Sequence, residues 1–284
     1  MNGRTALAEH GYLVVRGLIE QAVADDCLQQ IRNVFDNQLK HLGATPAPDL
    51  FSAALVLHHA DIDRFKKTMA SLWRLQAIGA LFNTAPIQKF LRAVLGFGPI
   101  FVPGGQTVHL QSAELKIPGG YFGLPAHQDW PSVQGSMDGI GVWVPLCAVD
   151  ADAYPLEVVP GSHRRGLVAP AHDRLDGIWN VDNFADLDFQ SLCVVPGDVV
   201  FFSNFLVHRS GLTGRPNFVR VACSTRFDNG DEPSFVARAY PSAYTRGVHR
   251  QLMDFPDVEA VNRQLAIASE PAPPAPPPNA SAAT

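Results

Sequence analysis

Hydrophobic and polar residues recur with two different periods along this chain, and the change comes near residue 100. After a short strand-like run at 11–15, apolar side chains recur at helical spacing over residues 23–42, and Gly43 follows as a predicted helix stop. The same spacing predicts a second helix over Phe65–Phe82 and a third over Pro86–Gly96. We therefore expect a helical layer in the first third of the chain.

Between about residues 100 and 240 the period falls to two, and clusters of Gly and Pro recur between the apolar runs. This pattern is typical of a mainly antiparallel sheet or barrel. The candidate strands are Gln106–Lys116, Ile140–Leu146, Leu156–Val159, Leu192–Val195, Val199–Ser203 and Phe218–Phe227. A last helix is predicted over 248–268, and the Pro- and Ala-rich segment 270–284 is predicted to be a disordered tail.

Composition places the chain among ordinary soluble globular proteins. Of its 284 residues, 46% are hydrophobic and 17% are charged, which argues against disordered and fibrous classes. Twenty-two Lys and Arg against 27 Asp and Glu give a net charge of −5. Such a chain offers no broad positive field to a nucleic acid, so we expect a small-molecule partner and no nucleic-acid partner.

Cysteine spacing and hydropathy bear on the compartment. The four cysteines are scattered, without the spacing of a structural zinc site, and are predicted to be buried thiols in a reducing compartment: Cys27, Cys147, Cys193 and Cys223. No apolar run approaches the about 20 residues that span a bilayer, and the N-terminus lacks a signal segment. We expect a cytoplasmic protein without a membrane partner; the oligomeric state is not predicted.

The first candidate chemistry lies at His127-Gln128-Asp129. In an extended segment, residues two apart point to the same side, so the imidazole of His127 and the carboxylate of Asp129 can converge on one metal ion. His208, which lies 81 residues later and follows a strand-like run, is the candidate third ligand. Two histidines and one carboxylate leave coordination positions open, as in non-haem Fe(II) oxygenases. The alternative for the His-x-Asp pair is an ordinary hydrogen-bonded surface pair.

The strand that follows His208 has one apolar and one polar face. Val219, Val221 and Cys223 alternate with Arg220 and Ser224. An arginine inside a barrel is costly unless it meets an anion, and its planar fork matches a carboxylate. Arg220 therefore predicts either a bound carboxylate ligand or a structural ion pair with an internal acidic residue.

Several segments in the same order resemble the phytanoyl-CoA dioxygenase-like Fe(II)/2-oxoglutarate oxygenases. The resemblance covers about residues 8 to 230 and is carried by Gly11–Leu18, Lys116–Pro118, His127–Trp130, Val142–Leu146, Leu156–His163, Pro196–Asp198, His208–Ser210 and Arg220. It implies a double-stranded β-helix, or jelly-roll, with helices packed on one sheet. It also implies one oxygenase domain over 1–269, with a helical part at 1–98 and a jelly-roll core at 99–240.

The resemblance assigns roles to individual residues. It implies that His127, Asp129 and His208 hold Fe(II), and that Arg220 binds the distal carboxylate of 2-oxoglutarate with help from Ser210. The interval from His208 to Arg220 is one residue longer than is usual in the family, so Arg215 and Arg226 are alternatives; of the three, Arg220 best combines spacing with a strand position.

Four further positions receive less specific roles. Trp143 matches a tryptophan that lines the co-substrate pocket, and Lys116 is expected in a strand that borders this pocket. Gln128 and Trp130 flank the metal ligands and are candidates for substrate contact, with packing at the barrel rim as the alternative for Trp130.

The reaction implied is hydroxylation of an unactivated C–H bond, with O₂ as co-substrate and 2-oxoglutarate converted to succinate and CO₂. Two alternatives stay open. The same centre could catalyse desaturation, epoxidation or ring closure, or the jelly-roll could bind a metal or ligand without turnover. Fold-level similarity does not choose a substrate, because members of the family act on many kinds of small molecule.

Overall fold

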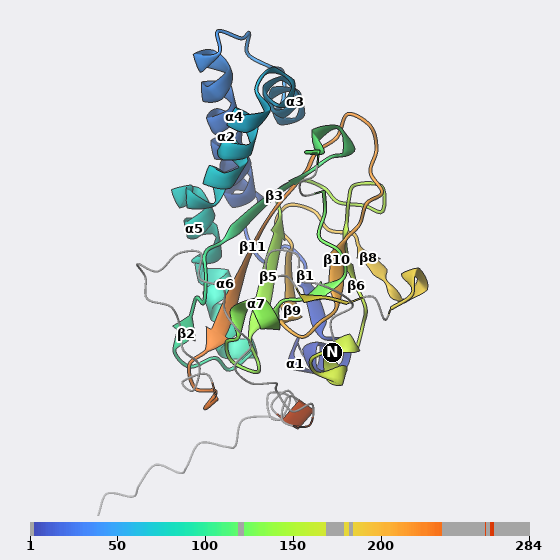
Figure 1. Cartoon of the computed structure of the whole chain (residues 1–284). Helices are drawn as coiled ribbons and strands as arrows, with labels where there is room; N and C mark the ends of the chain where they lie inside the picture. Colours follow the sequence, from blue (N-terminus) through green and yellow to red (C-terminus); the bar gives the residue numbers. More distant parts are fainter. Residues whose placement is uncertain are drawn as a thin grey trace, which may run out of the picture.

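Two antiparallel sheets and a layer of helices make up the protein. A computed structural model describes residues 3–118, 122–168, 179–181, 184–234, 259 and 262–263. Most of the helices lie along one face of the larger sheet, and the smaller sheet lies on its other side (Figure 1). This arrangement confirms the predicted jelly-roll class with a helical coat.

The larger sheet has six strands in the order β1-β9-β5-β11-β2, and β3 also pairs with β11. Its strands are β1 (Tyr12–Val15), β2 (Ile100–Phe101), β3 (Thr107–Gln111), β5 (Ile140–Pro145), β9 (Val199–Ser203) and β11 (Arg220–Asn229). The smaller sheet has the order β7-β4-β10-β6-β8. Its strands are β4 (His127–Gln128), β6 (Leu156–Val158), β7 (Trp179–Asn180), β8 (Gln190–Leu192) and β10 (His208–Ser210).

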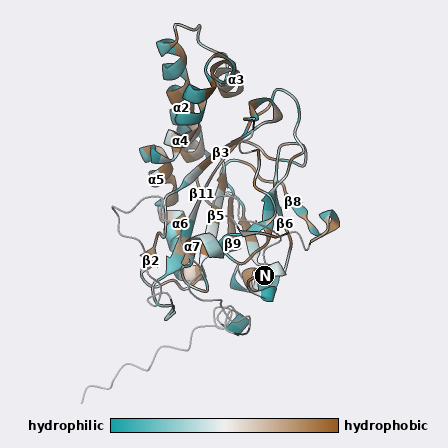
Figure 2. Ribbon diagram, in the orientation of Figure 1, coloured by the Kyte–Doolittle hydropathy of each residue, from teal (hydrophilic) through white to brown (hydrophobic). Residues whose placement is uncertain are grey.

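Amphipathic helices form the coat, and Figure 2 shows both hydrophilic and hydrophobic residues along them. The α-helices are α1 (Gly3–His10), α2 (Gln21–His41), α3 (Leu50–Ala60), α4 (Ile62–Ser71), α5 (Gln76–Phe82), α6 (Ala85–Lys89) and α7 (Trp130–Val133). A π-helical segment, Phe90–Val94, continues α6. Short 3₁₀ helices span Leu72–Arg74, Ala113–Leu115, Ser162–Arg165 and Asp186–Asp188.

Side-chain caps begin two of these helices, and a glycine ends another. The carboxylate of Asp49 accepts a hydrogen bond from the Ser52 amide at the start of α3, and Asp61 accepts one from the Arg64 amide at the start of α4. Gly43 follows α2 with a φ of +68°, a conformation that glycine adopts without strain. The predicted stop at Gly43 is confirmed.

The apolar run of β9 and β5 is explained by burial on both faces. Val142 and Phe201 pack against the helices, whereas Trp143 and Phe202 pack against residues of the smaller sheet. Every residue of β5 and β9 is buried. The sequence of a strand that is covered on both faces is a continuous hydrophobic run and not an alternating one.

The helical predictions are partly wrong. The predicted helix 65–82 is two helices, α4 and α5, joined by a 3₁₀ turn and by Leu75, whose ψ of 130° is not helical. No Gly or Pro marks this break in the sequence. The break allows Leu72 before it and Ile78 after it both to be buried in the core. The helices α1 and α3 were not predicted, although the predictions for α2 and for 86–96 are confirmed.

Strand ends also differ from prediction. The candidate strand 106–116 ends at Gln111, and 192–195 is displaced to β8, with Val194 forming an isolated bridge to Val149. Strands β2, β4, β7 and β10 have two or three residues each, too few for an alternating pattern to show.

Other predictions stand as follows. All four cysteines are free, but only Cys27 and Cys223 are buried; Cys147 is half-buried and Cys193 is exposed, so the predicted burial of these two is wrong. Over the described part of the chain, no helix combines the length and the apolarity that crossing a bilayer requires. The predicted tail 270–284 and most of the predicted helix 248–268 lie outside the described residues.

The coat should contribute strongly to stability through side chains such as Leu57, which is fully buried in α3. Leu57→Ala is expected to lower the free energy of unfolding by about 2–5 kcal/mol, because it leaves a cavity in the core. Leu187→Ala removes the same atoms from a side chain that is 97% exposed and should cost about 0.5 kcal/mol or less. Urea unfolding followed by circular dichroism measures both, and equal costs would contradict the described packing.

Candidate metal centre

Strand pairing brings the two candidate histidine ligands together. In the smaller sheet β4 and β10 are antiparallel neighbours, and His127 lies directly opposite His208. Side chains at directly opposite positions of two strands are close neighbours, and the two ring centroids are 4.2 Å apart. The fold thus brings two residues that are 81 positions apart in the sequence into contact.

Asp129 completes the cluster from the start of α7. The strand β4 ends at Gln128, and Asp129 already has helical backbone angles, so the extended geometry expected for His127-Gln128-Asp129 does not reach its last residue. The carboxylate nevertheless lies 3.6 Å from Nε2 of His127 and 3.9 Å from Nε2 of His208. Ligand atoms of the three buried residues all lie within 4.8 Å of one another, so they could hold a metal ion.

Backbone carbonyls orient both imidazoles for metal binding. Nδ1 of His127 lies 2.7 Å from the carbonyl oxygen of Pro125, and Nδ1 of His208 lies 3.0 Å from that of Leu206. A carbonyl can only accept, so each Nδ1 carries the proton and donates. Each Nε2 therefore presents a lone pair to the centre, the usual arrangement for a metal-bound histidine.

The electrostatics favour the protonation states that a metal requires. Burial, with a further contribution from His127, lowers the pKa of His208 to about 3 and keeps its ring neutral. Burial alone would raise the pKa of Asp129, but the guanidinium of Arg226 holds it well below its ordinary value. Neutral imidazoles and an ionised carboxylate are the forms that bind a divalent metal ion.

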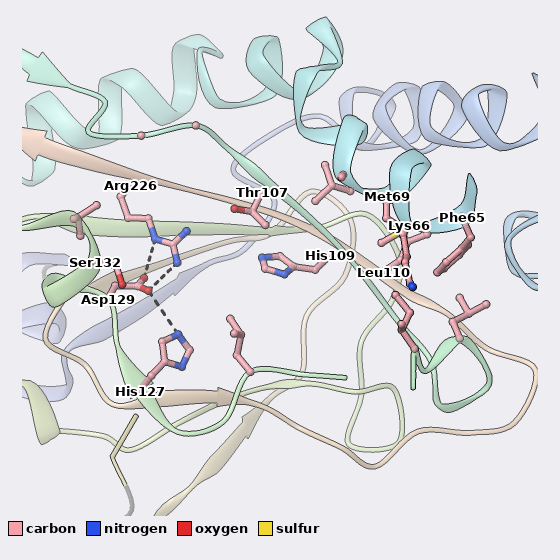
Figure 3. A pocket seen from close by; sticks show the side chains of 18 residues that line it. Phe65, Lys66, Met69, Thr107, His109, Leu110, His127, Asp129, Ser132 and Arg226 are labelled. Carbon is pink, nitrogen blue, oxygen red and sulfur yellow. Dashed lines mark hydrogen bonds and ion pairs between the residues drawn. The ribbon is translucent and has the colours of Figure 1, made fainter. Parts of the chain in front are cut away.

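Arg226 holds the Asp129 carboxylate with both arms of its guanidinium. Nε donates to Oδ2 at 2.9 Å and Nη2 donates to Oδ1 at 2.8 Å, as the dashed lines in Figure 3 show. Arg226 projects from β11 of the larger sheet, whereas Asp129 follows β4 of the smaller one. This bidentate pair joins the two sheets at the centre and fixes the orientation of the carboxylate.

Arg220, farther along the same face of β11, is buried between the sheets. Its Nε donates to the carbonyl oxygen of Tyr154 at 3.1 Å, and Nη2 donates to Oε1 of Gln111. Its guanidinium carbon is 5.7 Å from the centre of the Trp143 ring. Tyr154 has a φ of +52°, an unfavourable value for a bulky residue, and this local strain places the carbonyl that Arg220 uses.

A small cavity of about 30 Å³ between the sheets collects most of the residues predicted for the co-substrate. Arg220, Ser210 and Trp143 line it together with His127 and His208. Ser210 accepts a hydrogen bond from the Leu124 amide at 3.0 Å. Of the two alternatives to Arg220, Arg226 is held by Asp129, and Arg215 is exposed and paired with Asp150.

Lys116 does not lie where it was predicted. The strand β3 ends at Gln111, and a 3₁₀ helix, Ala113–Leu115, turns the chain before Lys116. Lys116 is exposed, its ammonium nitrogen is 5.7 Å from the centre of the Phe122 ring, and it lines neither this small cavity nor the larger one described below. Its placement in a strand bordering the pocket is therefore wrong.

Gln128 and Trp130 do not contact a cavity at the centre either. Gln128 points away from its neighbour His127, and its side-chain nitrogen donates to the carbonyl oxygens of Gly166 and Phe205. Trp130 is fully buried and stacks on Phe205, with ring centroids 5.4 Å apart. Neither residue lines either of the two cavities that the metal ligands border, and the packing alternative for Trp130 is confirmed.

A second, larger cavity of about 640 Å³ opens beside the centre. His127, Asp129, Ser132 and Arg226 line one end, and Phe65, Lys66 and Met69 of α4 line the opposite end (Figure 3). A volume of this size suits a small organic ligand.

Polar residues of β3 complete the site and were missed in the sequence. Thr107, His109 and Gln111 alternate with Val108 and Leu110, a period-two signal that could have identified them. His109 lies between the two ends of the larger cavity, and its Nε2 is 3.1 Å from Oγ of Ser224. Burial and the nearby Arg220 and Arg226 lower its pKa to about 3, so the ring is neutral.

Comparison with known proteins identifies the family. The model of the phytanoyl-CoA dioxygenase (PhyH) family matches residues 7–215. The chain belongs to the phytanoyl-CoA dioxygenase family. It is accordingly an oxidoreductase with iron and 2-oxoglutarate as its cofactor and co-substrate, and the His127, Asp129 and His208 cluster fits the metal.

One protein of similar sequence and two of similar fold accompany the family match. The 1-deoxypentalenic acid 11-beta-hydroxylase of Streptomyces exfoliatus is 25% identical over 229 residues, which cover 77% of each chain. The non-heme monooxygenase ThoJ shares the fold at a TM-score of 0.55 and 14% identity, over 80% of this chain and 76% of that one. EvdO2 from Micromonospora carbonacea var. aurantiaca, solved with 2-oxoglutarate, shares it at 0.50 and 16% identity, over 81% and 94%.

The two hydrogen bonds that the Arg226 guanidinium donates to Asp129 should support metal binding. Arg226→Leu removes these donors from the Asp129 carboxylate. We expect the affinity for Fe(II) to fall about 10- to 100-fold, as when other groups that orient metal ligands are lost. Arg226→Lys keeps the charge but not the fork and should recover part of the loss. Anaerobic calorimetric titration with Fe(II) measures the affinity.

Arg215→Leu is the matched control, because Arg215 forms an exposed ion pair with Asp150 away from the centre. It should bind Fe(II) as the parent protein does. If Arg226→Leu also bound Fe(II) with unchanged affinity, the carboxylate would not depend on the fork for its orientation.

Proposed function

We propose that this protein hydroxylates an unactivated C–H bond of a small molecule and converts 2-oxoglutarate to succinate and CO₂. The observation that carries the proposal is the position of the His127, Asp129 and His208 cluster between two cavities. His127 lines both of them, His208 lines the smaller cavity and Asp129 lines the larger one. A metal held there would face a co-substrate on one side and a substrate on the other.

In this proposal His127, Asp129 and His208 are the three ligands of Fe(II). With 2-oxoglutarate and O₂, the iron supplies oxidising power that no side chain has, so that one oxygen atom enters the substrate and the other enters succinate. These three side chains would hold the metal and leave coordination positions for 2-oxoglutarate and O₂. Arg226 keeps Asp129 ionised and oriented through its two hydrogen bonds.

Arg220 is proposed to bind the distal carboxylate of 2-oxoglutarate, with Ser210 as a second donor. Its guanidinium is fixed by Tyr154 and Gln111, so little side-chain entropy is lost when a carboxylate binds. Trp143 packs beside the guanidinium and forms an apolar wall of the same cavity. A buried cation with fixed orientation suits a dicarboxylate whose other end reaches the metal.

The larger cavity is proposed to hold the substrate. Its apolar lining binds a carbon skeleton and keeps water from the centre, which protects an oxidising site from side reactions. The sequence similarity to a hydroxylase that acts on a small organic molecule supports this proposal.

Succinate release tests the function. Purified protein supplied with Fe(II), ascorbate, 2-oxoglutarate and air should release succinate, and the release should rise when a metabolite extract is added. His208→Ala and Asp129→Ala should abolish the stimulated release, because each removes a proposed ligand, while circular dichroism confirms that each variant folds. Asp152→Ala, which changes an exposed carboxylate, should behave like the parent protein.

Product mass separates the possible outcomes of turnover. Hydroxylation adds one oxygen atom to the substrate, whereas desaturation removes two hydrogen atoms. If no condition gave succinate and calorimetry detected no binding of 2-oxoglutarate, a non-catalytic binding role would replace the proposal.

Arg220→Ala should raise the 2-oxoglutarate concentration needed for half-maximal turnover by about 10- to 100-fold, because a carboxylate loses a charged partner. Steady-state succinate release measures this concentration. Arg220→Lys should give an intermediate value, since it keeps the charge without the fork. Arg215→Ala should have no effect, and an effect of Arg215→Ala in place of Arg220→Ala would reassign the co-substrate site.

A further inference from the structure

The end of the larger cavity that lies opposite the metal ligands is formed by α4. Phe65, Lys66, Met69 and Ala70 occupy one side of this helix and line the cavity. Figure 3 shows Lys66, Phe65 and Met69 at the far end from His127 and Asp129, with Thr107 and His109 between the two groups. Lys66 therefore brings an ammonium group to the end that is remote from the metal.

Among the charged residues of this lining, Lys66 forms an ion pair that a bound ligand could replace. Arg226 and Asp129 are bonded to each other, and the ring of His109 is held neutral. Lys66 lies 3.4 Å from Asp63, but the two side chains are 46% and 76% exposed. An exposed pair of this kind contributes little stability, so a ligand carboxylate can replace Asp63 at small cost.

The rest of the described lining is mainly apolar. Its hydrophobic members are Phe65, Met69, Ala70, Val108, Leu110, Leu115, Ile117, Leu124 and Val133. Such a lining favours a hydrocarbon skeleton and disfavours sugars or other ligands with many hydroxyl groups, because those would lose hydrogen bonds to water without replacement.

We propose that the substrate is an amphipathic carboxylic acid, with its carboxylate bound by Lys66 and its apolar skeleton reaching along the cavity to the metal centre. This inference rests on the proposed function and adds the substrate class. Because the carboxylate is held at the far end, the C–H bond that is oxidised lies on the part of the skeleton remote from the carboxylate. Lys66 is thus a substrate-binding residue that selects both the class of substrate and the position of oxidation.

The two proposed carboxylate sites are separate. Arg220 lines the smaller cavity and not the larger one, whereas Lys66 lines the larger cavity and not the smaller one. A change at Lys66 should therefore alter binding of the substrate and leave 2-oxoglutarate binding unchanged.

Binding of matched ten-carbon probes tests the inference without turnover. We would titrate decanoate and decanol into the protein loaded with Fe(II) and 2-oxoglutarate under anaerobic conditions and follow binding by calorimetry. Decanol is the more hydrophobic probe, so apolar burial alone would favour it. We expect decanoate to bind more tightly, and we expect Lys66→Ala to weaken decanoate binding about five- to tenfold without weakening decanol binding.

Lys67→Ala is the matched control. Lys67 is the next residue of α4, but it lines a different surface hollow with Val34 and Gln38 of α2. It should leave binding of both probes unchanged. Lys66→Glu should weaken decanoate binding further, because it places a like charge beside the carboxylate. Tighter binding of decanol than of decanoate, or equal effects of the Lys66→Ala and Lys67→Ala changes, would overturn the inference.

Fractionation of the metabolite extract provides a second test if neither probe binds. The component that stimulates succinate release should pass into an organic solvent from an acidified extract and remain in water at alkaline pH, as an amphipathic carboxylic acid does. Stimulation by a neutral or a water-retained fraction would overturn the inference while the proposed function stands. Preferential decanoate binding without any succinate release would instead contradict the proposed function and leave the Lys66 site in place.

Discussion

Both faces of the larger sheet must be covered, and this constraint determines where chemistry is possible. The helices cover one face with apolar side chains from α2 to α6, and apolar residues of the smaller sheet cover part of the other. What remains is the region between the two sheets, where the polar faces of β3 and β11 meet β4 and β10. The metal ligands, the proposed 2-oxoglutarate site and the smaller cavity lie in this gap, and the larger cavity extends from the metal ligands to α4.

Charges inside such a gap are costly unless each has a partner, and the observed pairing follows from that requirement. Arg226 from one sheet holds Asp129 from the other, while Arg220 is held by the amide of Gln111 and the carbonyl of Tyr154. The first arginine is committed to the metal carboxylate. The second donates to two neutral acceptors and lines the smaller cavity, where we propose that it binds the distal carboxylate of 2-oxoglutarate. Two arginines six positions apart on one strand therefore have different roles.

His127 lines both cavities, so it lies at the boundary between the proposed co-substrate site and the proposed substrate site. On the smaller side, the side chains proposed to bind 2-oxoglutarate line a cavity of about 30 Å³. On the larger side, an apolar lining and one distant lysine suit a hydrocarbon skeleton with a single charge. The jelly-roll supplies the rigid part through strand pairing, whereas the coat helix α4 supplies Phe65, Lys66 and Met69, so substrate selection is assigned to an element outside the sheets.

Much of this protein could be predicted from the sequence where a periodic signal extends over several residues. The helix α2, the strands β5, β9 and β11, and the two faces of β11 follow from spacing alone. The resemblance of short motifs to the family supplied His127, Asp129, His208 and Arg220. Lys116 was misplaced in a strand, and Gln128 and Trp130 line neither cavity, because a nearby position in sequence does not determine which side of a turn a side chain occupies.

The sequence by itself determined the residue types that the chemistry needs and the secondary structure that carries most of them, because local spacing governs which face of an element a side chain occupies. Only the tertiary structure decided which residues meet. The pairing of His127 with His208, the fork of Arg226 on Asp129 and the position of Lys66 at the far end of the cavity each join segments distant in the chain. These contacts result from sheet register and from helix packing, and neither leaves a signal in local sequence.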